Sequence, residues 1–127
     1  MTREAADHSA DPFVALSAIL TGFDRVELWG TGLDETYKEE VTSTVGPEIS
    51  DNLWATTLQI IRRDGANGSQ LETAIRREIL ASPLFGPIAR NLIQLWYGGT
   101  WNQLPKSWRN LYGNNPNDTT RIISAEA

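Results

Sequence analysis

Side chains that could do acid–base or nucleophilic chemistry are few in this sequence. Histidine, the usual base beside a catalytic nucleophile, occurs once, as His8. The chain has no cysteine, which rules out a thiolate metal site. The carboxylate pairs Glu35–Glu39 and Glu39–Glu40 fall on the polar side of an expected helix, where carboxylates are usually solvated. We therefore expect no catalytic residue, no metal ligand and no cofactor-binding residue on this chain.

Aromatic side chains crowd the segment from Trp96 to Tyr112. Such rings combine a large apolar area with a polar group, which suits a core, a protein interface or the stacking of a sugar ring. Trp96 falls on an apolar helical stripe and is expected in the core, as is Trp54. Trp101 and Trp108 fall in or beside a stretch rich in glycine and proline, where core, interface and ligand contact all stay open.

Composition restricts the classes of partner. The chain has 127 residues, 40% of them hydrophobic, which suits one globular domain. A formal net charge of −5 disfavours nucleic acid and an anionic membrane surface, and no apolar run approaches the roughly 20 residues of a membrane-spanning helix. Residues 1–12 do not resemble an export signal, so we expect a cytoplasmic location as the sequence stands and a periplasmic one if a signal has been removed.

The elements that would position these side chains are helices. Apolar residues recur at helical spacing between strong start and stop residues, such as Asp11-Pro12 at the first start and Gly22 at the first end. Ser69 and Glu72 form a capping-box pattern that opens another helix. The expected helices cover residues 12–21, 31–45, 47–63, 69–81, 87–97 and 105–112, with residues 23–30 as an apolar connection.

No alternation of apolar and polar residues is long enough for a sheet. The sequence therefore predicts an all-α fold, an irregular bundle of five or six short helices with a loop-rich aromatic C-terminal segment. Residues 1–11 are expected to be a flexible tail and residues 12–127 a single helical domain. The side chains expected to anchor the core are Phe13, Leu16, Leu20, Trp54, Leu92 and Trp96.

Two strings in the sequence resemble a known family. The first is Phe13-Val-Ala-Leu-Ser-Ala-Ile-Leu-Thr-Gly22, with the pattern F-x-x-L-S-x-x-L-T-G, and the second is Leu95-Trp-Tyr-Gly98. Together they resemble the small subunit of bacterial flavin-dependent sugar and polyol dehydrogenases, such as those for sorbitol, fructose and glucose. The longer string from Ile93 to Pro105 is similar to a soluble-sugar-dehydrogenase branch, and the resemblance spans about residues 13–127.

This resemblance implies a division of labour. In that family a large subunit, similar to glucose–methanol–choline oxidoreductases, holds FAD and the catalytic histidine, and some complexes add a haem subunit. The small subunit is helical, has no redox centre, and is needed for the folding, maturation or export of the large one. This chain would then dock on its partner through an aromatic surface, for which the candidates are Trp101, Leu104, Trp108, Tyr112 and Tyr97.

The chain departs from that family in two ways. Relatives often carry a twin-arginine export signal, and they tend to continue past the region around residues 120–125 with a further aromatic tail. A free-standing helical domain that binds a sugar or a lipid is the alternative. It would place Trp101, Trp108 and Tyr112 around a pocket, because aromatic faces stack on sugar rings and cover apolar chains.

Overall fold

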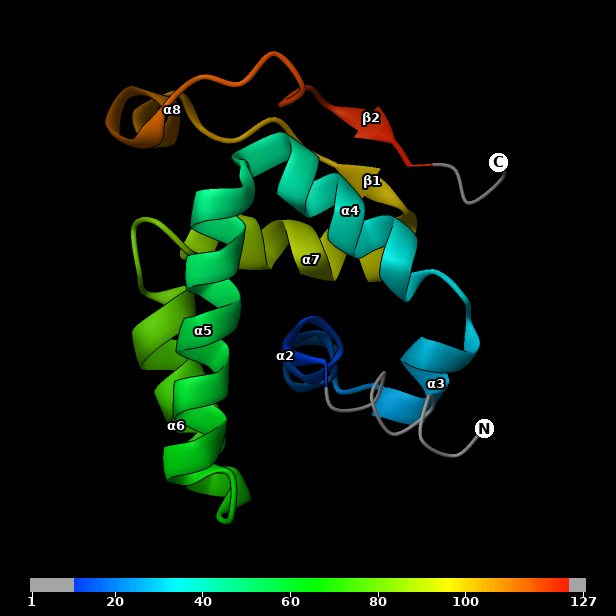
Figure 1. The fold of residues 1–127 in the computed structure, drawn as a ribbon, viewed down its shortest axis with the longest axis vertical. Helices are drawn as coiled ribbons and strands as arrows, with labels where there is room; N and C mark the ends of the chain where they lie inside the picture. Colours follow the sequence, from blue (N-terminus) through cyan, green and yellow to red (C-terminus); the bar gives the residue numbers. More distant parts are fainter. Residues whose placement is uncertain (1–10, 124–127) are drawn as a thin grey trace.

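The computed structural model describes residues 11–123, and in them it confirms an all-α fold with one small sheet (Figure 1). This range holds seven α-helices, one more than the largest number that the sequence suggested. The strands pair antiparallel, with Thr100 opposite Ile122. In order, the elements are α2 (Pro12–Thr21), α3 (Arg25–Gly30), α4 (Asp34–Val45), α5 (Pro47–Asp64), α6 (Gly68–Ile75), the π-helical η1 (Arg76–Leu80), α7 (Gly86–Gly98), β1 (Thr100–Trp101), α8 (Lys106–Tyr112) and β2 (Arg121–Ile122).

The two ends of α2 lie where the sequence predicts them. Asp11 accepts a hydrogen bond from the backbone N–H of Phe13 at 2.8 Å and pairs with Lys38 at 2.9 Å. It therefore belongs to the folded part of the chain and not to the predicted tail, whose other residues, 1–10, lie outside the described range. Gly22 ends the helix with a φ of 82°, a left-handed conformation that glycine adopts without steric strain.

Several helix starts differ from the prediction. Helix α4 begins at Asp34 and not at Thr31, because Thr31 ends α3 and its hydroxyl accepts from Leu33 N at 3.1 Å. The starts of α7 and α8 differ by one residue.

Residues 25–30 form α3, because Asp24 accepts from Val26 N at 2.8 Å while Asp24 N donates to Glu27 Oε1 at 3.0 Å. This reciprocal cap starts a helix that is too short to show an apolar stripe. The spacing of its apolar residues therefore predicts a connection and not a helix. Helix α6 begins at Gly68, because Asn67, and not Ser69, accepts from the first turn.

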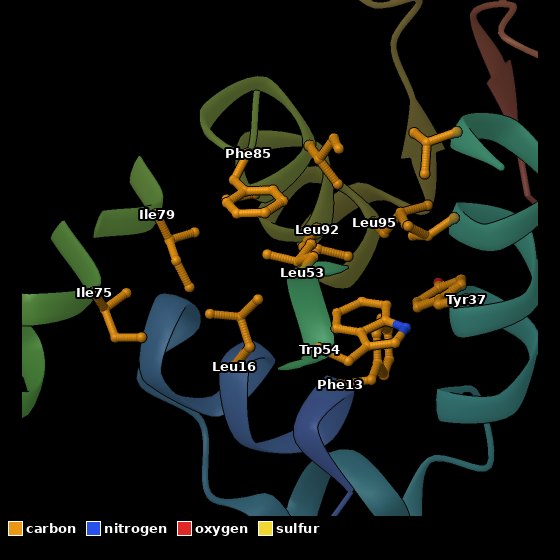
Figure 2. Packing of buried hydrophobic residues seen from close by; sticks show 14 of the residues in the cluster. Phe13, Leu16, Tyr37, Leu53, Trp54, Ile75, Ile79, Phe85, Leu92 and Leu95 are labelled. Atoms are coloured by element: carbon orange, nitrogen blue, oxygen red, sulfur yellow. The ribbon is translucent and has the colours of Figure 1, made fainter. Parts of the chain in front are cut away.

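Side chains from α2, α4, α5, α7 and the α6–η1 segment form one core (Figure 2). Phe13 meets Trp54 edge to face with ring centroids 5.5 Å apart, and Tyr37 meets Trp96 edge to face at 5.0 Å. Such arrangements add to the gain from apolar burial. Of the predicted anchors, Phe13, Leu16, Trp54 and Leu92 are buried, and Leu20 and Trp96 are half-buried against the same cluster.

The path from η1 into α7 brings two backbones unusually close. The last π-helical turn closes with a 2.9 Å hydrogen bond from Ala81 N to Arg76 O, and the chain then reverses into α7. A Cβ atom on Gly86 would lie 2.5 Å from the carbonyl oxygen of Leu80. Only a residue without a side chain fits at this start of α7.

Tyr37 makes the stability of the core sensitive to alkaline pH. Burial raises the pKa of its phenol above the ordinary value of 10.0. The unfolded chain therefore loses this proton first, so the stability tied to the neutral phenol is present below about pH 10 and is lost as the pH rises through the raised pKa. We expect Tyr37→Phe to lose less unfolding free energy than the parent between about pH 9 and 11. Urea unfolding across that range measures it, and a parallel decline in both proteins would contradict the assignment.

Candidate functional site

Three of the five predicted contact residues, Trp101, Leu104 and Trp108, belong to the core. Trp101 is 0% exposed, Leu104 1% and Trp108 4%. The prediction that these three side chains contact a partner is therefore wrong, because they have almost no accessible area to bury. Trp96, which the helical stripe placed in the core, is more exposed than any of them.

A buried carboxylate, that of Asp118, holds this segment in place. It accepts the indole N–H of Trp101 at 2.9 Å and the backbone N–H of Leu104 at 3.0 Å and 3.2 Å, one distance for each oxygen. Bonds to an ionised acceptor are stronger than neutral ones, and they leave no buried donor unpaired here. Asp118 lies in a polar, turn-rich stretch whose sequence gives no sign of this role.

The amide of Asn91 ties the same segment to α7. Its Nδ2 donates to Asn102 O at 2.9 Å, and its Oδ1 accepts from Asn102 N at 2.8 Å. The indole of Trp108 donates to Leu84 O at 2.8 Å. Both indole N–H groups are therefore bonded within the chain, and Trp101 is fully buried. Trp101 cannot line the sugar or lipid pocket of the alternative function.

An exposed aromatic surface lies where α2, α3 and α7 meet. Tyr97 is 62% exposed and Phe23 37%, and their ring centroids are 5.3 Å apart. Val26, in the first turn of α3, is also exposed. We call Phe23, Val26 and Tyr97 the Phe23–Tyr97 patch. The sequence predicts Tyr97 on a contact surface, but it gives no such sign for Phe23, which begins an apolar connection.

Tyr112 is the other predicted contact residue with accessible area. It is half-buried at the end of α8, and its ring centroid lies 5.3 Å from that of Trp108. Of the five predicted contact residues, Tyr97 and Tyr112 therefore remain available to a partner, and the three between them in the chain do not.

Of the carboxylates in the predicted acid pairs, Glu40 is half-buried and pairs with Arg121 at 2.9 Å, and the other two are solvated. Glu35 and Glu39 are exposed on α4 and line an open hollow of about 530 Å³. Its far wall is the loop of Asn115 and Asn117, whose side-chain amides donate to Ser43 O at 3.3 Å and 3.2 Å. The loop thus caps the C-terminal end of α4, where free carbonyl groups need donors.

The single histidine, His8, lies outside the residues that the structure describes. Within residues 11–123, no three His, Cys, Asp or Glu side chains are grouped so that they could hold a metal ion. Nor does that range contain a helix long and apolar enough to cross a membrane. Comparison of the chain with protein-family models, curated proteins and solved structures finds no match.

Proposed function

We propose that this chain is a non-catalytic small subunit that binds, folds and stabilises the large FAD-containing subunit of a sugar or polyol dehydrogenase or oxidase. The observation that carries the proposal is the Phe23–Tyr97 patch, an exposed pair of packed rings with an exposed valine nearby. Aromatic side chains are enriched at protein interfaces, where they bury a large area. FAD and the catalytic residues then belong to the partner chain.

Contact between the two strings that resemble the small-subunit family supports the proposal. Phe13 of the first string packs against Trp96 of the second, with ring centroids 6.2 Å apart. Tyr97 of the second donates from its hydroxyl to Thr21 O of the first at 3.0 Å. The patch lies next to the contacts between the two strings, since Phe23 directly follows the first string and Tyr97 belongs to the second. The same two segments thus build part of the core and present the proposed docking surface.

The patch is already ordered before any partner binds, which favours tight association. The hydroxyl bond of Tyr97 and its contact with Phe23 restrict both rings. The reciprocal cap between Asp24 and Glu27 fixes the first turn of α3, which carries Val26. Side chains that are held in place lose less conformational entropy on binding than mobile ones do.

Removing the patch should weaken the complex with the large subunit. We expect the double variant Phe23→Ser/Tyr97→Ser to bind a co-expressed flavoprotein candidate at least tenfold less tightly, a loss of about 1.4 kcal/mol or more. The measurement is co-purification with the untagged large subunit, followed by mass determination and visible flavin absorbance. Circular dichroism of the isolated variant checks that the helices are intact.

Ile122→Ser is the control, because it removes a large apolar side chain that is even more exposed than Phe23 and Tyr97 but lies on β2, away from the patch. It should bind the flavoprotein as the parent does. Two results would overturn the proposal. One is a large subunit that is soluble, loaded with FAD and fully active without this chain. The other is a double variant that binds as tightly as Ile122→Ser.

A further inference from the structure

Charge is distributed very unevenly along this acidic chain. All 16 Asp and Glu residues lie outside the stretch from Ile79 to Asn117, whose charged side chains are Arg90, Lys106 and Arg109. That stretch contains α7, β1 and α8. The charges within this stretch of the sequence are therefore all cationic, and the carboxylate that packs against it is that of Asp118, bonded to Trp101 and Leu104.

A groove runs between the start of α7 and the segment that leads into α8. It consists of two adjoining hollows of about 310 Å³ and 210 Å³, which share Pro87, Arg90 and Pro105 as lining residues. The larger hollow is lined about equally by polar and apolar surface, and Leu111 at its edge is one of the most exposed large apolar side chains of residues 11–123. The smaller hollow is lined by the side-chain amides of Asn91, Gln94, Asn102 and Gln103.

Within residues 11–123, the three cations of this stretch make no ion pair with a carboxylate. Arg90 lines both hollows, and Lys106 lies between the lining residues Pro105 and Ser107. Neither makes an ion pair with another described residue, and Arg109 bonds only uncharged oxygens, on Leu104 and Asn114. By contrast, the cations paired with carboxylates elsewhere in this range include Lys38, Arg63, Arg77 and Arg121.

We infer that this groove, which we call the α7–α8 groove, binds an extended acidic segment of a protein partner. A carboxylate of that segment pairs with Arg90, and an apolar side chain rests against Leu111 and the neighbouring proline rings. The exposed amides of Gln94, Asn102 and Gln103 can bond the backbone of the segment. The groove shares no residue with the Phe23–Tyr97 patch, so this inference does not depend on the proposed function.

Charge complementarity selects this occupant over others. An acidic segment gains from Arg90, which lines both hollows and makes no ion pair with another described residue, and no Asp or Glu lines either hollow. Attraction of this kind speeds and orients association. A nucleic acid also carries negative charge, but its long phosphate backbone would meet the acidic remainder of the chain. A short acidic peptide meets the cationic groove alone.

A peptide array tests the inference with the full chain. One set of peptides alternates Asp or Glu with Leu, Ile, Val or Phe, and a matched set replaces each acid by its amide. We expect labelled chain to bind acidic peptides at least tenfold more tightly than their amide counterparts. Binding should weaken as salt is raised, because partly exposed ion pairs are screened.

Variants locate the binding. Arg90→Gln and Leu111→Ser should each reduce the affinity of the best acidic peptide at least fivefold in fluorescence polarisation, while Arg62→Gln, at an exposed cation on α5, leaves it unchanged. Equal binding of acidic and amide peptides, no binding by either set, or an Arg90→Gln chain that binds like the parent overturns the inference. So does a concentration-dependent dimer that Arg90→Gln abolishes, because a second copy would then be the occupant.

Discussion

Replacing Asp118 by alanine is expected to lower the free energy of unfolding by about 3 kcal/mol. The substitution leaves two buried donors without an acceptor. They are the indole N–H of Trp101 and the backbone N–H of Leu104, which lie 2.9 Å and 3.0 Å from Asp118 Oδ1. An unsatisfied buried donor costs about 1–3 kcal/mol because it has lost its bonds to water. Urea unfolding followed by tryptophan fluorescence measures the loss, and release of Trp101 to solvent should shift its emission to longer wavelength.

Two further variants separate the hydrogen bonds from the charge. Asp118→Asn keeps an acceptor oxygen of similar geometry and should lose only about half as much, since the ionised acceptor is the stronger one. Asp51→Ala removes an exposed carboxylate on α5 and should change stability by less than about 0.5 kcal/mol. A loss below about 1 kcal/mol for Asp118→Ala would mean that the two donors find other partners.

Gly86→Ala should destabilise the fold by about 2 kcal/mol, although it adds a single methyl group in a helix. The new Cβ would lie 2.5 Å from the carbonyl oxygen of Leu80, and that oxygen belongs to backbone and cannot swing aside as a side chain can. The start of α7 and the end of η1 must therefore move apart, which loosens the packing of both. Thermal unfolding monitored by circular dichroism measures the change.

Gly30→Ala is the matched control for this prediction. A Cβ at Gly30 meets nothing within 4 Å, and Gly30 is exposed at the end of α3. Because alanine restricts the unfolded chain and favours helix, this substitution should be neutral or stabilising by up to about 1 kcal/mol. If both glycine variants behave alike, the close approach of Leu80 to Gly86 does not constrain the fold.

Local signals in the sequence account for most of the helices. Asp11-Pro12, Gly22 and Gly46-Pro47 act through their own backbone and side-chain chemistry, so helix ends at these positions could be predicted without tertiary information. The cap of Asp24 with Glu27 is equally local, and a search for acid-x-x-Glu pairs would have found α3. The β1–β2 pairing could not be predicted, because two-residue strands carry no periodicity.

The candidate contact surface was harder to predict than the fold. The sequence around Trp101 predicts an irregular segment, and irregular segments are usually exposed. The burial of Trp101 depends on Asp118, which is distant in sequence and is placed by a turn-rich loop. Phe23 lies next to a helix stop, and whether it packs inward depends on the position of Tyr97 on another helix. Residue type and spacing do not contain this long-range information.

The core contains side chains from the segment after α7, and this order along the chain has a consequence for synthesis on the ribosome. The helices from α2 to α7 emerge first, but the core cluster still lacks Trp101, Leu104, Trp108 and Ile123 at that stage. Until Asp118 has also emerged, the indole N–H of Trp101 lacks its acceptor. Apolar surface left open on a nascent chain invites association with other unfinished chains. A chaperone that shields this protein would therefore act after the helices from α2 to α7 have formed and before β1 has paired with β2.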